Sequence, residues 1–213
     1  MVQGEEILSI GILDIGIGNV GSVCNTVYSQ GWDPILVSHR KDFEKLSHLI
    51  LPGVGSYAST IKKLHAKNLF ESIKDFSETK KPILGICIGM QILNDNGTEG
   101  GSTEGLGLIS GQTIPLSEAE GLYLPHVGWN EVSHNRDHPL LNDIKPNVDF
   151  YFVNSYYFDA YDSQDIISYS EHGQKFPAIV AKNNIIGVQF HPEKSQLNGL
   201  RMIDNFCTWD GEC

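Results

Sequence analysis

The sequence predicts an α/β fold with an open, mostly parallel central sheet flanked by helices, and with extra antiparallel strands in its second half. Short apolar runs alternate with segments of helical periodicity between residues 7 and 86. Glycine-rich turns follow several of these runs, at the ends where parallel sheets bind ligands. Strand-like pieces lie closer together after residue 149.

The first strand and helix are expected around a glycine-rich turn. The apolar run Ile7–Asp14 ends at the turn Gly16–Asn19. Residues of the following segment recur at helical spacing and would bury one face: Val20, Val23, Cys24, Val27 and Tyr28. Asn19 is the expected N-cap of this helix, because its side-chain oxygen can accept a hydrogen bond from the first turn. Cys24 is interpreted as a core residue.

The remaining elements are expected from the same patterns. In the first half, strands are predicted at Pro34–Ser38, His48–Leu51 and Ile83–Ile86, and one helix over Ile61–Thr79. In the second half, strands are predicted at Asp149–Val153, Ala178–Ala181 and Ile185–Phe190, and a terminal helix at Gly199–Phe206. A length of 213 residues suits one domain, residues 1–213, with a core over about residues 7–206 and a polar tail at 207–213.

Composition narrows the class of function. The net charge of −11 comes from scattered acidic residues, which argues against nucleic-acid binding. No apolar run approaches the roughly 20 residues that span a bilayer, and Met1–Glu6 is acidic where a secretory signal would be basic. The four cysteines are far apart and form no CxxC pair. We therefore expect a cytoplasmic protein with no disulfide framework, metal or other cofactor.

The sharpest motif is Gly85-Ile86-Cys87-Ile88-Gly89, placed where a strand meets a helix. Small residues flank a potential nucleophile at a turn that would be too tight for larger side chains, which is the pattern of a nucleophile elbow. A helix beginning after Cys87 would favour its thiolate through free N–H groups and a positive dipole. Taken alone, the pentapeptide fits equally a buried cysteine between two packing glycines.

Two further segments supply what thiol catalysis needs. His191-Pro192-Glu193 offers a base and a carboxylate that can face one site, although the tripeptide also suits a surface turn. Pro52-Gly53-Val54-Gly55 follows a strand and can aim backbone N–H groups at a substrate, although a plain turn is the alternative. The N–H groups of Val54 and Ile88 are the expected oxyanion hole.

These segments, in this order, resemble the class I (triad) glutamine amidotransferases, which have a flavodoxin-like fold. Two stretches, Pro125–Asn130 (PHVGWN) and Phe152–Tyr156 (FVNSY), are similar to segments of the glutaminase subunits of imidazole glycerol phosphate synthases. The turn at Asp14–Asn19, the elbow up to Gln91 and Val188–Ser195 (VQFHPEKS) agree with that subgroup too. The resemblance covers the chain from about Ile7 to Phe206.

The resemblance implies a glutaminase that releases ammonia from L-glutamine and passes it to a (β/α)₈ cyclase or synthase partner. Cys87 would be the nucleophile, His191 the general base and Glu193 the orienting carboxylate. Other matching positions would hold glutamine: Gly53, Gly55, Gln91, Glu99, Asn154, Ser155 and Tyr156. A last group would lie toward the partner, near the exit of ammonia: Asn19, Trp129, Tyr151 and Lys194.

The sequence departs from the subgroup at two positions. Asn154 stands where the family usually has His, and Ile15 replaces a frequent aromatic residue. Both positions are expected on the partner-facing side, so a paralogue that supplies ammonia for amidination of a surface sugar stays open. A γ-glutamyl-type cysteine hydrolase would not need the PHVGWN segment. A non-catalytic scaffold would be expected to lose Cys87, His191 or Glu193.

Overall fold

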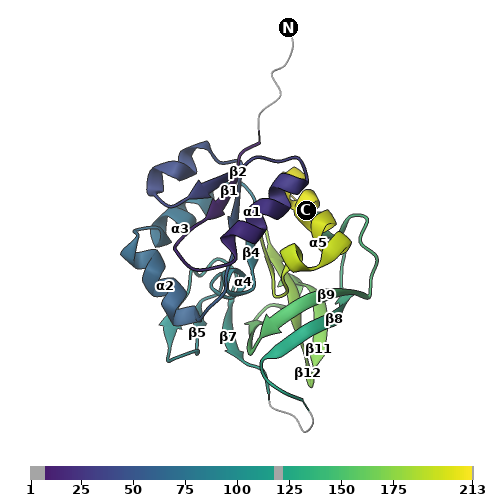
Figure 1. Cartoon of the computed structure of the whole chain (residues 1–213). Helices are drawn as coiled ribbons and strands as arrows, with labels where there is room; N and C mark the ends of the chain where they lie inside the picture. Colours follow the sequence, from purple (N-terminus) through teal and green to yellow (C-terminus); the bar gives the residue numbers. More distant parts are fainter. Residues whose placement is uncertain (1–7, 118–121, 213) are drawn as a thin grey trace.

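A nine-stranded sheet runs through the centre of the protein, and helices cover both faces of its first half (Figure 1). The computed structural model describes residues 8–117 and 122–212. The first five strands of this sheet are parallel and occur in the order β2 (Pro34–Val37), β1 (Ile10–Leu13), β3 (His48–Leu51), β4 (Ile83–Ile86) and β13 (Ile185–Val188).

The second half of the sheet is antiparallel. It continues from β13 with β12 (Gln174–Lys182), β11 (Ile166–His172), β8 (His126–His134) and β9 (Val148–Asn154). A separate four-stranded sheet contains β10 (Tyr156–Ala160), β7 (Gly111–Pro115), β5 (Asn96–Gly97) and β6 (Thr103–Glu104). The predicted fold class is confirmed. The large sheet has five parallel strands, and its remaining four strands pair antiparallel.

Two hydrophobic cores form because successive strand residues point to opposite faces of the sheet. Ile50 joins the core under α1 (Val20–Ser29) and α5 (Gln196–Thr208). Its neighbours Leu49 and Leu51 join the core under α2 (Tyr57–Ala66) and α3 (Phe70–Glu78). The strand β3, apolar after His48, is therefore buried on both sides, as expected for a central parallel strand.

The helix predicted over Ile61–Thr79 is two helices. The break falls at Asn68, whose φ of 56° lies in the left-handed region that asparagine tolerates better than most residues. Leu69 is fully buried at this break, and its N–H donates to the carbonyl oxygen of Leu64. The sequence does not reveal the break, because apolar residues recur at helical spacing across it. Both helices direct these residues to the same core.

Two other expectations about burial fail. Tyr28 was expected on the buried face of α1, but it is 69% exposed. Cys24, by contrast, packs against the core as expected, although it is only partly buried. Helix α5 extends into the expected polar tail, where Cys207 is fully buried and Trp209 nearly so. His48 Nε2 lies 2.8 Å from the Trp209 carbonyl oxygen, so the segment after α5 packs against the first residue of β3.

Candidate active site

Cys87 lies at a strained turn between β4 and the short helix α4 (Ile88–Gln91). Its φ of 54° and ψ of −110° are rarely adopted by a residue with a side chain, and such strain concentrates at functional sites. The Cys87 N–H donates to the carbonyl oxygen of Val188 at 2.8 Å, which fixes the turn to β13. The geometry is that of a nucleophile elbow. With only four residues, α4 supplies less dipole than the sequence suggested.

Backbone packing explains the small flanking residues of this elbow. A Cβ added at Gly89 would lie 1.8 Å from the Leu51 carbonyl oxygen, and one at Gly85 would lie 2.4 Å from the Gly89 carbonyl oxygen. Both distances are far below any real Cβ contact. The elbow is therefore held by direct contact between backbones, which only glycine allows.

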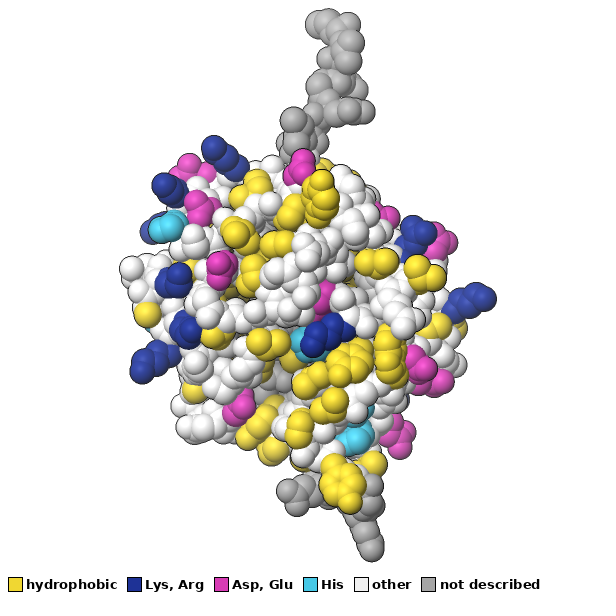
Figure 2. All heavy atoms as spheres, in the orientation of Figure 1, with side chains coloured by type: hydrophobic (Ala, Val, Ile, Leu, Met, Phe, Trp, Pro, Cys, Tyr) yellow, Lys and Arg dark blue, Asp and Glu magenta, His cyan; other side chains and the backbone are white. Residues whose placement is uncertain are grey.

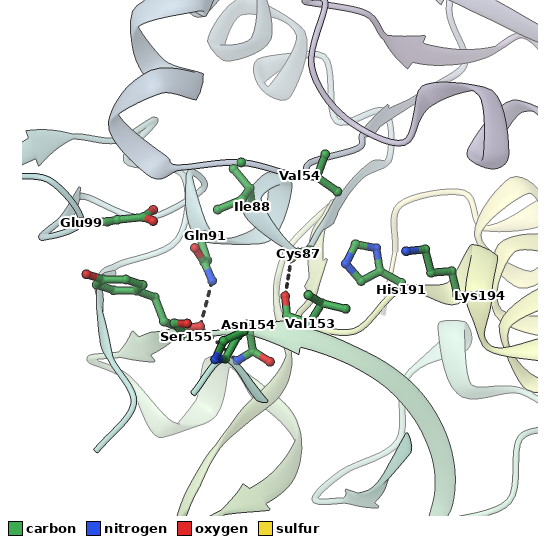
Figure 3. Close-up of a pocket in the computed structure, with 13 residues that line it drawn as sticks. Val54, Cys87, Ile88, Gln91, Glu99, Val153, Asn154, Ser155, His191 and Lys194 are labelled. Carbon is green, nitrogen blue, oxygen red and sulfur yellow. Dashed lines mark hydrogen bonds between the residues drawn. The ribbon is translucent and has the colours of Figure 1, made fainter. Parts of the chain in front are cut away.

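His191 and Glu193 form a buried pair beside the nucleophile. His191 Nδ1 lies 2.9 Å from Glu193 Oε1, and the two side chains are 2% and 1% exposed. The carboxylate can only accept, so Nδ1 carries the hydrogen and Nε2 is left for the thiol. The His191 N–H donates to the Tyr151 carbonyl oxygen at 2.8 Å, so β9 positions the base. Cys87 and His191 line one cavity (Figure 3).

The electrostatics of the pair favour a protonated imidazole. Burial alone would lower the pKa of His191, but interactions with Cys87 and Glu193 outweigh it and raise this pKa to about 10. Burial alone would raise the pKa of Glu193, but its hydrogen bond and ion pair with His191 and a hydrogen bond from Asn19 lower it. A proton released by the thiol is thus well held on His191, beside an ionised carboxylate.

Removing the thiol should lower the pKa of His191. The Cys87→Ala variant loses one of the two neighbours that hold this pKa near 10, while Glu193 remains. Because the folded-state pKa lies above the ordinary 6.5, the stabilisation by the protonated ring is complete below about pH 6.5 and is lost as pH rises through the folded-state pKa. In the variant, this loss should begin at lower pH.

Titration of the His191 ring by NMR in both proteins measures this shift directly. His48, whose pKa is lowered by burial, lies at the opposite end of the parallel strands and is the internal control, so its titration should be the same in the two proteins. An unchanged His191 titration in Cys87→Ala would show that the thiol does not interact with the base.

Asn19 reaches the same carboxylate from the loop after β1. Its Nδ2 donates to Glu193 Oε1 at 3.1 Å, and its side chain makes no capping hydrogen bond to α1. The predicted N-cap position is correct, but the predicted side-chain cap is wrong, because the amide is directed toward the carboxylate instead. The loop that carries Asn19 is therefore in direct contact with the His191–Glu193 pair.

The two expected oxyanion donors border the cavity together. Val54 and Ile88 both line it, and within the described residues neither backbone N–H has a hydrogen-bond acceptor. The segment that carries Val54 packs directly on the elbow, since a Cβ at Gly53 would lie 2.6 Å from the Gly89 nitrogen. Gly55 has a φ of 119°, which a residue with a side chain rarely adopts. The arrangement is suited to binding an oxyanion.

The cavity has a volume of about 250 Å³ and is open to solvent at one side (Figure 3). All but one of the expected glutamine-binding residues line it, namely Gly55, Gln91, Glu99, Asn154, Ser155 and Tyr156. The exception is Gly53, which supports the elbow instead. Pro125, Val153 and Lys194 complete the wall, and sequence reasoning did not place the first two there.

Gln91 and Glu99 differ in how they are held. Gln91 is 2% exposed, its Nε2 donates to the Tyr156 carbonyl oxygen at 3.0 Å, and its Oε1 has no partner within the described residues. Glu99 Oε2 accepts from the Tyr57 N–H at 2.6 Å, so this carboxylate also caps α2. An unpaired amide oxygen and a carboxylate in one cavity suit a ligand that carries an ammonium group.

Sequence reasoning also missed Gln189, which is fully buried next to the nucleophile. Its Nε2 lies 3.8 Å from Cys87 Sγ, and its Oε1 accepts from Gln91 Nε2 at 3.0 Å. The available signal was a polar residue directly after the apolar strand 185–188, within the VQFHPEKS segment.

Of the residues expected to face a partner, Lys194 lines the cavity, and Tyr151 and Trp129 extend from it as an aromatic pair. The Trp129 ring lies 5.9 Å from that of Tyr151, and Lys194 Nζ lies 5.7 Å from the Tyr151 ring. On the face shown in Figure 2, hydrophobic side chains gather around a basic side chain and a histidine near the centre of the view. Exposed apolar residues of the chain include Val54, Tyr123, Val127, Trp129 and Leu197. A surface of this composition is suited to contact with another protein.

The two departures from the subgroup pattern are buried. Ile15 is 4% exposed and packs in the core under α2 and α3. Asn154 is 5% exposed, and its Nδ2 donates to the Tyr156 carbonyl oxygen at 3.1 Å. Neither side chain is exposed, and Asn154 belongs to the cavity wall, so their place on the partner-facing side stays a prediction.

Within residues 8–117 and 122–212, no group of three or more His, Cys, Asp or Glu side chains is arranged to hold a metal ion. None of the described helices is long and apolar enough to cross a membrane.

Comparisons with known proteins identify the family of the chain. The sequence profile of the family "Glutamine amidotransferase class-I" matches residues 11–208. The chain is 41% identical to "Imidazole glycerol phosphate synthase subunit HisH" of Caldanaerobacter subterraneus subsp. tengcongensis, over 92% of this chain and 96% of that one. It is 40% identical to the protein of the same name from Sulfurimonas denitrificans, with the same coverage.

Solved structures show the same fold at much lower identity. PurLQS from Thermotoga maritima superposes with a TM-score of 0.74 at 19% identity, covering 93% of this chain and 97% of that one. A glutamine amidotransferase crystal structure superposes with a TM-score of 0.72 at 16% identity, covering 92% and 96%.

Proposed function

The chain belongs to the class I glutamine amidotransferases, and we propose that it is the glutaminase subunit of an imidazole glycerol phosphate synthase. It is a glutamine-hydrolysing enzyme of that family, and the proposed complex serves histidine biosynthesis. The observation that carries the proposal is identity of about 40%, over 92% of the chain, to HisH subunits from distinct bacteria. The site adds a cysteine, a base and a carboxylate in contact around one cavity.

The proposed reaction is acyl transfer through Cys87. The thiolate attacks the side-chain carbonyl carbon of glutamine, and the N–H groups of Val54 and Ile88 bind the developing oxyanion. His191 then gives its proton to the departing nitrogen, so that ammonia leaves and a glutamyl thioester remains. Water, deprotonated by His191, attacks the thioester and releases glutamate and the free thiol. The net change is glutamine plus water to glutamate plus ammonia.

Substrate recognition follows from the charges that line the cavity. The Glu99 carboxylate and Gln91 Oε1, which has no partner in residues 8–117 and 122–212, suit the α-ammonium group of glutamine. The backbone of Asn154, Ser155 and Tyr156 forms the opposite wall, with Gly55 at the oxyanion side. A γ-glutamyl-type hydrolase would not need the PHVGWN segment, whose Pro125 borders this cavity of about 250 Å³.

The proposed partner is a (β/α)₈ cyclase subunit that docks over the cavity mouth and takes up the ammonia. Asn19, Trp129, Tyr151 and Lys194 are the contacts proposed for this heterodimer. Their position supports it, since Lys194 lines the cavity and Trp129 is 46% exposed. The cytoplasm is the proposed compartment, because a nucleophilic thiol such as Cys87 persists where thiols stay reduced.

The alternative acceptor, a surface sugar, loses its main support in the structure. It depended on the changes at Ile15 and Asn154, and both side chains are buried, so they offer little exposed surface by which a different partner could be selected. We therefore favour histidine biosynthesis over sugar amidination.

Complementation tests the proposed acceptor. The chain is expressed in a histidine auxotroph that lacks its own amidotransferase subunit and retains the cyclase, at low ammonium. We expect growth without histidine, because ammonia released at Cys87 reaches the cyclase. The Cys87→Ala chain should not support growth at low ammonium. Both strains should grow at high ammonium, because the synthase can use free ammonia directly.

Failure to grow at low ammonium, with soluble protein and a reactive Cys87, would assign the ammonia to another acceptor. Growth with the Cys87→Ala chain at low ammonium would show that the rescue does not come from glutamine hydrolysis.

A further inference from the structure

Gln189 occupies a buried position between the nucleophile and the glutamine pocket. It follows β13, is 0% exposed, and its backbone N–H donates to the Ala178 carbonyl oxygen at 2.9 Å. Its side-chain amide contacts Cys87 Sγ on one side and Gln91 Nε2 on the other. Because the side chain is shielded from solvent, each of these hydrogen bonds is electrostatically stronger than the same bond would be at the surface.

The orientation of the Gln189 amide follows from a chain of hydrogen bonds that begins at a backbone carbonyl. The Tyr156 carbonyl oxygen can only accept, so the Gln91 atom 3.0 Å away must be the Nε2 donor. That same Nε2 lies 3.0 Å from the Gln189 amide, where it requires the acceptor Oε1. The Nε2 of Gln189 is therefore directed at Cys87 Sγ, 3.8 Å away.

An N–H donor beside sulfur favours one of its two protonation states. A thiolate accepts a hydrogen bond far better than a thiol does, so a fixed donor stabilises the charged form. Two other groups face Cys87 Sγ. The protonated His191 ring favours the thiolate through its charge and hydrogen bond, whereas the Val153 carbonyl oxygen at 3.7 Å accepts from the thiol and favours the neutral form. Gln189 opposes that preference.

We propose that Gln189 is a catalytic residue whose side-chain N–H stabilises the Cys87 thiolate, and that Gln91 links this hydrogen bond to the glutamine pocket. The inference rests on the proposed glutaminase function and adds a residue to it. Gln91 donates through Nε2 to Gln189, and its Oε1 has no hydrogen-bond partner in the part of the chain that the structure describes. When a ligand N–H donates to Gln91 Oε1, the hydrogen bond from Gln91 Nε2 to Gln189 and the one from Gln189 Nε2 to Cys87 Sγ both become stronger, because hydrogen bonds in a chain strengthen one another.

The Gln189→Met variant tests the proposal. Methionine has a similar length and no N–H donor, and Gln91 keeps its bond to the Tyr156 carbonyl oxygen. The readout is the rate of alkylation of Cys87 by iodoacetamide against pH in the full-length chain, followed by mass spectrometry of the Cys87 peptide. We expect the profile to move to higher pH and the rate at neutral pH to fall about tenfold. The kcat for glutamine should fall more than KM rises.

Asn184 supplies the matched control. This buried amide precedes β13 at the opposite end of the strand, and its Nδ2 donates to the carbonyl oxygens of Ser77 and Lys81. Asn184→Leu should lower stability while the alkylation profile of Cys87 stays that of the parent. A purely structural role for Gln189 predicts the same behaviour for Gln189→Met, and that result would overturn the proposal.

A second measurement does not depend on the folding of the Gln189 variant. In the parent chain labelled with ¹⁵N at glutamine, the side-chain N–H signals of Gln189 should shift as Cys87 ionises. In Cys87→Ala, the same signals should stay constant over that pH range. Constant signals in both proteins would overturn the proposal.

Alkylation uses neither glutamine nor a synthase, so its outcome is independent of the proposed function. A chain that hydrolyses no glutamine but shows the Gln189-dependent shift would refute the function and support the hydrogen bond.

Discussion

Replacing Cys87 with alanine should abolish glutamine hydrolysis and leave the fold intact. No other described thiol lines the cavity, so the acyl transfer loses its only nucleophile there. Removal of a nucleophile of this kind costs on the order of 10⁴-fold or more in kcat. Alanine adds no atom at the strained φ of 54° and gives up only the contacts of the sulfur. Glutamate release and the thermal unfolding midpoint measure the two halves of this expectation.

An electrophilic glutamine analogue provides the positive counterpart. It should label Cys87 alone, because it enters the cavity and Cys87 is the thiol at its base. Cys207 is fully buried, and burial raises its pKa to about 12, so it is unreactive. Burial also raises the pKa of Cys24. Labelling at Cys24, Cys207 or Cys213 instead would show that the active site is assigned wrongly; Cys213 lies outside the described residues.

Substituting Gly89 with alanine should destabilise the whole domain. The new Cβ would lie 1.8 Å from the Leu51 carbonyl oxygen and 2.8 Å from its carbon. Both atoms belong to the central strand β3, which is buried on both faces and cannot move aside alone. We expect the free energy of unfolding to fall by about 3 kcal/mol or more, since forced overpacking moves backbone as well as side chains.

Gly21→Ala is the control for this substitution. Gly21 lies on the exposed side of α1, and a Cβ there would meet nothing within 4 Å. Alanine should therefore raise stability by up to about 1 kcal/mol, through its better helix propensity. Urea unfolding of both variants gives the comparison. A Gly89→Ala protein within about 0.5 kcal/mol of the parent would contradict the packing described for the elbow.

The parts of the fold that follow from local chemistry could be predicted. The strands His48–Leu51 and Ile83–Ile86 were found at their observed bounds, because a short apolar run between turn residues has one simple explanation. The elbow and the His191–Glu193 pair followed from residue types whose chemistry depends on their spacing. These features need no knowledge of distant parts of the chain.

What could not be predicted depends on contacts between distant segments. The helix break at Asn68 arises from packing that periodicity does not record. Strand β8 alternates imperfectly and contains Gly128 and Asn130, so it has no strand signal of its own and exists through pairing with β9. The role of Gln189 was equally hidden, because its partners Gln91 and Cys87 are about a hundred residues away in sequence.

The direct backbone contact at Gly89 also bears on how such enzymes diversify. The position of the nucleophile depends on main-chain atoms, which every substitution elsewhere leaves in place. Side chains that line the cavity, such as those of Val54 and Lys194, can therefore be substituted during evolution without moving the nucleophile, so that glutamine hydrolysis is retained. An ancestral glutaminase of this kind could therefore acquire new recipients for its ammonia by changes at its surface alone, with no intermediate that has lost hydrolysis.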